Sequence, residues 1–470
     1  MQLPKFVGAI AVLVATALPT IGASAQSAVN LDALKGLSPV SALENTIAGK
    51  AALKGNLLVT GAIQDGSGRQ PTLLPFREQQ QQSLRDAFIT WGNAFELADA
   101  LGSKLGGVYQ SLTPYTSVDD GKTSQFASLS PAVANLIAYA IVTIDSDAGS
   151  GKYFFGNATT DGKNPVSAEA SAILKSANGV TDIFGVAYGL PAGGKGADAY
   201  GDSRPFQTEP EVLTFKGKDF FGVPSDNIVY LHGPTQDLTD NPSYPSGHTT
   251  YGYTEALLLA LLVPERYPQM VVRAAEYGND RIILGAHYAM DVLGGRTLAA
   301  YDLAQLLANK PGYVGVERRG IQIGDFRQAL ATARADVSAA LKDGCHEPVT
   351  VCAKQDRSRF ARPANNLAFY ETTQTYGLPA VFPGAARKVE DVGALAPEAG
   401  YLLTAAFPYL TLRQADAILT ATEGPGGGFL DNGSAFGVYS RLDLYRAAQW
   451  AIALAPGGAN RHFLGKPKRF

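Results

Sequence analysis

Apolar side chains recur at intervals of three and four residues in this chain, which is the spacing of one face of an α-helix. The pattern is clearest at Leu84, Phe88, Trp91, Phe95 and Ala98, and again at Phe326, Leu330, Ala333, Val337 and Leu341. The two-residue alternation of a half-buried strand is scarce. The sequence therefore predicts a mainly α protein with minor strands, in which these stripes face the core.

Several residue pairs predict where helices begin or end. Ser130 before Pro131 is typical of a helix start, and the helix that follows is expected to run to about residue 142. Gly278 has the character of a C-terminal cap for a helix over 265–277. Thr411 and Gln414 have capping-box spacing. Further helices are expected over 247–263 and about 286–307.

The N-terminus has the features of a secretory signal peptide over residues 1–25. Lys5 makes the first segment positive, the apolar run Phe6 to Leu18 follows, and Ala23-Ser24-Ala25 is an A-x-A cleavage site. An uncleaved anchor is the alternative. We expect an exported protein, periplasmic or extracellular. The longest later apolar run, Ala256 to Val263, has eight residues, against about 20 for a membrane span, so no stable span is expected after signal removal.

The remaining chain divides on composition into three parts. Residues 26–80 resemble a loosely structured N-terminal extension, and residues 81–345 hold the main helical domain. Polar and charged residues from Cys345 to Pro363 mark a soft boundary before a C-terminal helical subdomain over 346–470.

Charge and composition exclude several classes of protein. The 39 basic and 42 acidic residues give a net charge of -3, which disfavours a nucleic-acid-coating role. A hydrophobic share of 46%, with 21 Tyr and 21 Phe, excludes disorder over the whole length. Oligomeric state has no signal in the sequence.

Two cysteines, Cys345 and Cys352, are separated by six residues. In an oxidising compartment they are expected to form a disulfide, which would contribute about 2 kcal/mol by closing a short loop. The alternative is a metal site with His346, but this set has too few ligands for structural zinc.

One phosphate-binding motif is incomplete. Gly189, Gly194 and Lys195 have P-loop spacing, but Gly196 stands where a magnesium-binding Ser or Thr is needed. Nucleotide-triphosphate hydrolysis is therefore disfavoured.

Three short motifs downstream carry the main functional signal. The first is Lys195 followed nine positions later by Arg204-Pro205, and the second is the tetrad Pro245 to His248. The third places His287 six residues after Arg281 and Asp291 four residues after His287. Each motif alone has ordinary structural explanations, but their occurrence together and in this order is not expected by chance.

These residues resemble the three-part signature of the phosphatidic acid phosphatase type 2 superfamily, most closely bacterial class A-like secreted acid phosphatases; the superfamily also holds vanadium haloperoxidases. The resemblance covers Lys195 to about Arg296. It implies a helical-bundle core of the acid phosphatase/haloperoxidase type, here with an additional C-terminal helical region. Two positions depart from the pattern. The family's lysine usually lies seven positions before the arginine, where this chain has Ala197. The family usually has a serine directly before the third-motif arginine, and this chain has Asp280 there, whose charge can pair with Arg281.

Physical chemistry assigns the cations of these motifs to anion binding. Arg204 and Arg281 can each donate hydrogen bonds to two phosphate oxygens, while Lys195 supplies a point charge. Ser246 and the backbone N–H of Gly247 can complete the cradle.

The resemblance also implies a mechanism. His287 attacks phosphorus and becomes a phosphohistidine, and Asp291, one helical turn away, fixes its tautomer. His248 protonates the leaving alkoxide and then activates water, which predicts an acidic pH optimum. No metal and no other cofactor is expected, and vanadate is expected to inhibit.

The sequence therefore predicts a secreted, metal-independent acid phosphatase acting on a small-molecule phosphomonoester. Three alternatives stay open: a vanadium-dependent haloperoxidase, a lipid or polyprenyl phosphate phosphatase, and a phosphate-binding scaffold with a decayed site. Thr249 after the tetrad resembles the phosphatases, since haloperoxidases more often have alanine there.

Overall fold

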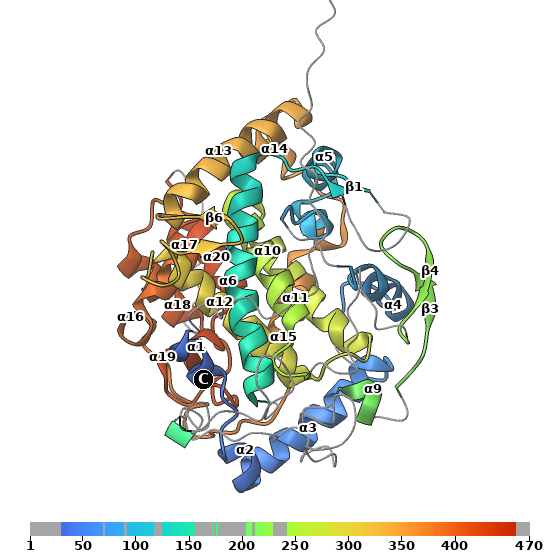
Figure 1. Ribbon diagram of the computed structural model, residues 1–470, viewed down its shortest axis with the longest axis vertical. Helices are drawn as coiled ribbons and strands as arrows, with labels where there is room; N and C mark the ends of the chain where they lie inside the picture. The colour runs from blue at the N-terminus through green and yellow to red at the C-terminus, as the bar shows by residue number, and fades with distance from the viewer. Residues whose placement is uncertain are drawn as a thin grey trace, which may run out of the picture.

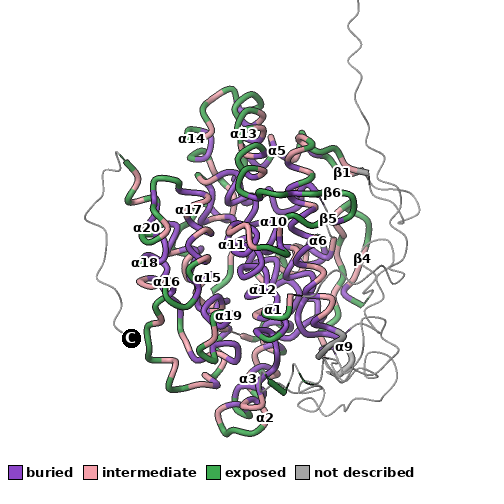
Figure 2. Tube along the Cα trace, turned by 60° about the vertical axis from the view of Figure 1, so that its left-hand side comes forward, coloured by how far each residue is buried: buried purple, intermediate pink, exposed green. Residues whose placement is uncertain are grey.

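Three buried helices that carry the second and third motifs form the centre of the computed structural model (Figures 1 and 2). They are α10 (Gly247–Leu262), α11 (Tyr267–Ile283) and α12 (Ala289–Leu307), and nearly all their side chains are buried. In α10 and α12 the apolar residues lie on all sides, as expected for helices surrounded by protein. The structure describes residues 30–68, 71–88, 92–116, 125–155, 172, 175–176, 204–208, 212–228 and 242–456.

A long helix, α6 (Pro131–Phe155), lies against this centre and contacts α10, α12 and α13 (Phe326–Cys345) (Figure 1). It begins as predicted, because the Ser130 hydroxyl accepts a hydrogen bond from the Val133 N–H at 3.2 Å. It continues beyond the expected end at about residue 142. The stripe from Phe326 to Leu341 is buried along α13, as the periodicity predicts.

The N-terminal described residues are helical. These elements are α1 (Leu31–Leu37), α2 (Ala42–Asn45), α3 (Ile47–Gln64), α4 (Phe76–Arg85), the 3-10 helix η1 (Glu96–Leu101) and α5 (Leu105–Leu112). Loose structure was expected up to residue 80 and is wrong for α1 and α3, since both pack on the central helices. The stripe from Leu84 to Ala98 is not one helix, because α4 ends at Arg85.

Strands are short and paired locally wherever the structure is described. The pairs are all antiparallel: β1 (Tyr115–Thr116) with β2 (Gln125–Phe126), β3 (Lys216–Lys218) with β4 (Pro224–Asp226), and β5 (Glu317–Arg318) with β6 (Ile321–Gln322). The prediction of a mainly α fold is confirmed.

The described C-terminal elements are helical. They are α14 (Val349–Cys352), η4 (Arg359–Ala361), α15 (Pro363–Thr375), α16 (Val392–Leu395), η5 (Pro397–Gly400), α17 (Tyr401–Thr404), α18 (Leu412–Thr422), α19 (Ala435–Tyr439) and α20 (Leu444–Ala453). Helices α15 and α20 contact α11, while α17 and α19 contact α12. One hydrophobic cluster runs from Ala33 to Ala451, so the parts before and after residue 345 share a core.

The two ends of this core meet at α1 and α19. A methyl group placed on Gly36 of α1 would lie 2.0 Å from the ring of Phe436 on α19, so the glycine allows the ring to lie against the α1 backbone. The contact joins residues about 400 positions apart in the chain.

Two local predictions had different outcomes. The capping box of Thr411 and Gln414 begins α18 as predicted. Gly278 does not end a helix, because α11 runs through it to Ile283. A methyl group on Gly278 would lie 2.9 Å from Val292, which shows that this glycine allows α11 and α12 to approach closely.

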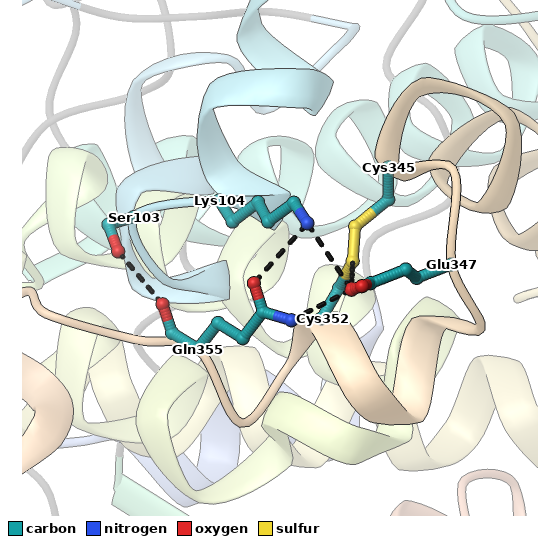
Figure 3. The surroundings of a disulfide bond; sticks show 6 residues. All are labelled: Ser103, Lys104, Cys345, Glu347, Cys352 and Gln355. Atoms are coloured by element: carbon teal, nitrogen blue, oxygen red, sulfur yellow. Dashed lines mark hydrogen bonds and ion pairs between the residues drawn. A yellow bond between two sulfur atoms is a disulfide. The ribbon is translucent and has the colours of Figure 1, made fainter.

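A disulfide joins Cys345 at the end of α13 to Cys352 at the end of α14 (Figure 3). Glu347, within the closed loop, pairs with Lys104 at 3.3 Å and accepts a hydrogen bond from Gln355 at 2.7 Å. The disulfide takes up the two thiols that a metal site with Glu347 or His346 would need as ligands. None of the described helices combines the length and the apolar character that crossing a bilayer requires.

Candidate active site

The described parts of the three motifs meet where α9 (Pro205–Thr208), α10 and α12 begin. The N–H of Phe206 donates to the carbonyl of Gly285 at 3.1 Å, which ties the first motif to the third. The N–H of Ser246 donates to the backbone carbonyl of Asp291 at 3.0 Å, which ties the second to the third. Lys195, Ala197 and the incomplete P-loop lie outside the described residues, as does the signal segment.

His287 lies between a cation and a carboxylate. Its Nε2 is 3.0 Å from Nη1 of Arg204, and its Nδ1 is 3.4 Å from Oδ2 of Asp291. We expected His287 to lie on a helix, and this expectation is wrong. His287 precedes α12, and Asp291 reaches back from the first turn, where Oδ2 also accepts the Tyr288 N–H at 2.8 Å.

The partners of the His287 ring determine its tautomer. A guanidinium group has donors only, so Nε2 facing Arg204 must present its lone pair. The proton then resides on Nδ1, where Asp291 can accept it. The Ser243 hydroxyl donates to the same Oδ2 and lies 3.3 Å from Nδ1. The lone pair of the ring is therefore on Nε2, the nitrogen that faces Arg204.

The site is buried and strongly positive around this ring. Burial, followed by the charges of Arg204, Lys152, His248 and Arg281, holds the pKa of His287 well below its ordinary value of 6.5. Nearby positive charges act in this direction because they disfavour a second charge on the imidazole. His287 is therefore neutral at mildly acidic pH.

The pKa of Asp291 is shifted in the opposite direction, above its ordinary value. Burial raises the pKa of Asp291 to about 6, although the hydrogen bonds from Ser243 and Tyr288 and the nearby cations favour its charged form. The carboxylate is thus ionised above about pH 6 and can then hold the Nδ1 proton.

The second motif forms the start of α10. Ser246 is the N-cap, and its Oγ accepts hydrogen bonds from the N–H of Thr249 at 3.2 Å and its hydroxyl at 2.8 Å. Because Oγ already accepts two hydrogen bonds, the Ser246 side chain can bind an anion only by donating its hydroxyl hydrogen. The N–H groups of Gly247 and His248 belong to the first turn, where the helix dipole favours negative charge.

Two glycines, Gly294 and Gly295, let α12 approach this loop. A methyl group on Gly295 would lie 2.6 Å from the carbonyl oxygen of Ser246, and one on Gly294 would lie 2.5 Å from the ring of Tyr244. Any larger residue would push α12 and the loop apart. The Gly-Gly pair after the third motif was the sequence signal for this contact, and it was missed.

Arg281 is held in place by Asp86 and Tyr277. It donates to the backbone carbonyl of Asp86, and its guanidinium carbon lies 4.7 Å from the centre of the Tyr277 ring. The suggested pairing with Asp280 is wrong, because the Asp280 side chain hydrogen-bonds to that of Asp86. Burial and the charge of Asp86 raise the pKa of Asp280 well above its ordinary value, which favours the neutral form of this carboxyl group.

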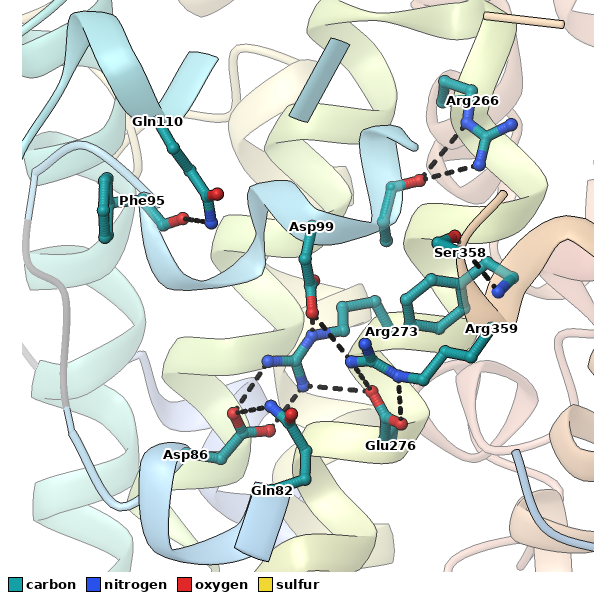
Figure 4. Close-up of polar contacts among 12 residues, drawn as sticks. Gln82, Asp86, Phe95, Asp99, Gln110, Arg266, Arg273, Glu276, Ser358 and Arg359 are labelled. Atoms are coloured by element: carbon teal, nitrogen blue, oxygen red, sulfur yellow. Dashed lines mark hydrogen bonds and ion pairs between the residues drawn. The ribbon is translucent and has the colours of Figure 1, made fainter. Parts of the chain in front are cut away.

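Asp86 belongs to a buried network of ion pairs (Figure 4). Arg273 contacts both carboxylate oxygens of Asp86 and pairs with Asp99 at 2.9 Å and Glu276 at 3.4 Å. Arg359, from the C-terminal part of the chain, contacts Glu276 and Asp99. The network anchors Asp86, whose backbone holds Arg281.

The sequence did not single out three residues that the structure brings to the site. Ser243 contacts His287 and Asp291, Asp86 holds Arg281, and the buried Lys152 contacts the loop that carries Ser243. Ser243 lies within the polar turn cluster before Pro245, which was its sequence signal. Lys152 was missed because the helix that carries it was expected to end at about residue 142, whereas α6 continues to Phe155.

The chain was compared with known proteins. Residues 198–308, which include all the described motif residues, match the family model of the PAP2 superfamily. This agrees with the resemblance inferred from the three motifs.

Several curated proteins that are similar to part of this chain are bacterial phosphatases by name. An acid phosphatase of Zymomonas mobilis is 30% identical over 136 residues, which is 29% of this chain and 46% of the relative. A non-specific acid phosphatase of Providencia stuartii is 32% identical over 146 residues, 28% of this chain and 57% of the relative. One of Salmonella typhimurium is 46% identical over 69 residues, 15% of this chain and 28% of the relative. The chain thus spans about half the length of the first two.

Proposed function

We propose that this protein is a secreted, metal-independent acid phosphatase that hydrolyses small-molecule phosphomonoesters through a phosphohistidine on His287. The main support is the placement of His287 between Arg204 and Asp291, with its Nε2 lone pair directed at a guanidinium group. The names of the curated relatives support the reaction class.

Substrate binding would use the cations and N–H donors around Nε2. Arg204 bonds to His287 at 3.0 Å and also donates to the carbonyl of Pro242 at 3.2 Å. A phosphoryl group that enters would take over the guanidinium donors, which frees the Nε2 lone pair. The Ser246 hydroxyl, the N–H of Gly247 and Arg281 would bind the other oxygens. These donors favour the five-coordinate transition state, in which charge gathers on the equatorial oxygens.

In the first chemical step, the Nε2 lone pair of His287 forms a bond to phosphorus and the bond to the leaving oxygen breaks. The leaving oxygen takes the electron pair and receives a proton from His248. The imidazole becomes positive as it is phosphorylated, and Asp291 offsets that charge through the Nδ1 proton.

In the second step, water attacks phosphorus while neutral His248 accepts a water proton. The bond between Nε2 and phosphorus breaks, its electrons return to the ring, and inorganic phosphate leaves. Protonated His248 and neutral His287 are then restored for the next cycle.

The decisive experiment is an assay of the mature protein with an aryl phosphate. We expect turnover that EDTA leaves unchanged and vanadate inhibits, and a covalent phosphate on His287 that acid releases and alkali preserves. Inhibition by EDTA that metal reverses would contradict the metal-independent mechanism. Full activity in His287→Ala would exclude the assigned nucleophile.

Further assays of the same mature protein separate the alternative chemistries. Bromide oxidation on addition of vanadate and peroxide would identify a haloperoxidase, and turnover restricted to lipid or polyprenyl phosphates would identify a lipid phosphatase. Phosphate binding without turnover of any ester would indicate a scaffold protein.

A further inference from the structure

Helix α3, in the N-terminal part of the chain, carries three buried polar side chains on one face. Asn56, Thr60 and Gln64 follow one another at intervals of four residues, which places them in a row along the helix. Their exposed fractions are 0%, 2% and 3%. Because buried polar groups need hydrogen-bond partners, this row must meet polar atoms of another segment.

Two of the three side chains accept hydrogen bonds from the start of α12. Oδ1 of Asn56 accepts the N–H of Met290 at 2.9 Å, and Oγ1 of Thr60 accepts the N–H of Ala289 at 3.1 Å. The first N–H groups of a helix have no partner within that helix. Here α3 supplies the acceptors, so the first turn of α12, which holds Asp291, is bonded to α3.

Gln64 holds the chain on the other side of His287. Its Nε2 donates to the carbonyl of Ile283, the last residue of α11, at 3.3 Å and to the carbonyl of Leu213 at 2.7 Å. Its Oε1 accepts the N–H of Leu213 at 2.7 Å. The neighbouring Ile63 shares an apolar cluster with Ile283. Helix α3 is therefore bonded to the backbone both before and after His287.

The geometry of the His287 ring depends on this segment. His287 lies between Ile283, where α11 ends, and Ala289, where α12 begins. Its Nδ1 is 3.4 Å from Asp291, and its Nε2 is 3.0 Å from Arg204. A displacement of about 1 Å in a catalytic group can reduce a rate by about 100-fold. Hydrogen bonds at both ends of the segment limit such a displacement.

We infer that Asn56, Thr60 and Gln64 are positioning residues for the proposed nucleophile, and that they hold the segment 283–290 from helix α3. The inference rests on the proposed function. It gives a role at the site to a helix that lies outside residues 198–308, the part of the chain that the family model matches. The effect of these side chains is transmitted by the backbone on either side of His287.

The first test is T60V, which keeps the shape of the side chain and removes the acceptor for the Ala289 N–H. We expect kcat for an aryl phosphate to fall about 10-fold, as a displacement smaller than about 1 Å would cause. The dissociation constant of inorganic phosphate, measured by calorimetry, should stay close to wild type, because Ser246, Gly247 and Arg281 lie outside this segment. T60S restores the acceptor and should restore most of kcat.

Amide hydrogen exchange is a second readout, and it needs no turnover. In T60V the amides of residues 283–290 should exchange faster, while the other core helices keep their wild-type rates. A general structural role for Thr60 would instead raise exchange across the core. T143V is the matched control, because Thr143 is also buried but its hydroxyl donates to the Tyr139 carbonyl of its own helix, α6, at 2.8 Å. It should keep wild-type kcat and wild-type exchange in 283–290.

If T60V does not fold, Q64M removes the bond to Ile283 at the other end of the segment and serves in both measurements. Wild-type kcat in a folded T60V or Q64M would overturn the inference, as would a loss that T60S shares. Such results with normal wild-type turnover would leave the proposed phosphatase intact. Absence of turnover in the wild type, with faster exchange confined to 283–290 in T60V, would instead reject the proposed function alone. If exchange is also unchanged, both proposals fail.

Discussion

Ser243 and Asp291 are joined by a buried hydrogen bond that connects the loop before α10 to the first turn of α12. The bond lowers the pKa of Asp291 and fixes the oxygen that faces Nδ1 of His287. Ser243→Ala should therefore reduce kcat/KM about 10-fold, the cost of one hydrogen bond to a charged group. Steady-state assays would measure it. Ser111→Ala, which removes an exposed hydroxyl that bonds to a backbone carbonyl, is the control and should be neutral.

Asp291→Asn should be more damaging than Ser243→Ala. An asparagine can donate its amide hydrogen to Nδ1, which moves the ring proton to Nε2 and removes the nucleophilic lone pair. By analogy with tautomer loss in serine protease triads, kcat should fall on the order of 10³ to 10⁴-fold. Phosphate binding, measured separately, should change little. A variant that retains a tenth of wild-type kcat would show that Asp291 does not set the tautomer.

The pH dependence should follow from Asp291 rather than from His287. His287 is already neutral because its pKa is well below 6.5, so it does not limit the rate at mildly acidic pH. The pKa of Asp291 is raised to about 6, so the carboxylate is available above that value and is lost as the pH falls through it. We expect kcat/KM to decline on the acid side near pH 6. Ser243→Ala should move this limb to higher pH, and an unmoved limb would exclude Asp291 as its cause.

Gly295→Ala tests the close contact between α12 and the second motif. The added methyl group meets the Ser246 carbonyl oxygen at 2.6 Å, so the loop must shift. We expect a loss of at least 10-fold in kcat/KM, in line with the cost of small displacements of catalytic groups. Gly149→Ala in α6 is the matched control, because its methyl group meets nothing within 4 Å. The control should keep full activity and gain about 0.5 to 1 kcal/mol in stability.

Asp86→Asn should destabilise the fold. Asp86 and Arg273 are both fully buried, and although burial opposes it, the charge and hydrogen bonds of Arg273 hold the pKa of Asp86 well below its ordinary value. Neutralising one partner of a buried pair should reduce the free energy of unfolding by about 3 kcal/mol, measured by urea denaturation. Asp343→Asn, at an exposed position in α13, is the control. Equal stability of the two variants would contradict a structural role for the network.

The sequence located the parts of the site that lie in short motifs. Ser246, Gly247 and His248 could be placed at a helix start, and His287 next to Asp291, because turn chemistry and spacing are local properties. Ser243 and Lys152 could not be assigned, because their roles depend on contacts across 48 and 90 residues.

For the fold as well, local patterns could be predicted from the sequence and long-range packing could not. Periodicity predicted α13 and the central helices. It misplaced the end of α11 at Gly278, because helix packing rather than a cap explains that glycine. It also missed the helical N-terminal segment and the shared core, which depend on long-range packing.

The meeting of α1 with α19 has a consequence for biosynthesis. Residues near position 36 emerge from the ribosome early, whereas Phe436, against which they pack, emerges almost at the end. The part of α1 that packs on Phe436 therefore stays uncovered until nearly the whole polypeptide has been made, although α6 and α12, which α1 also contacts, are made earlier. Such a chain benefits from holding by chaperones until its last helices arrive, and a late truncation would expose apolar surface at its beginning.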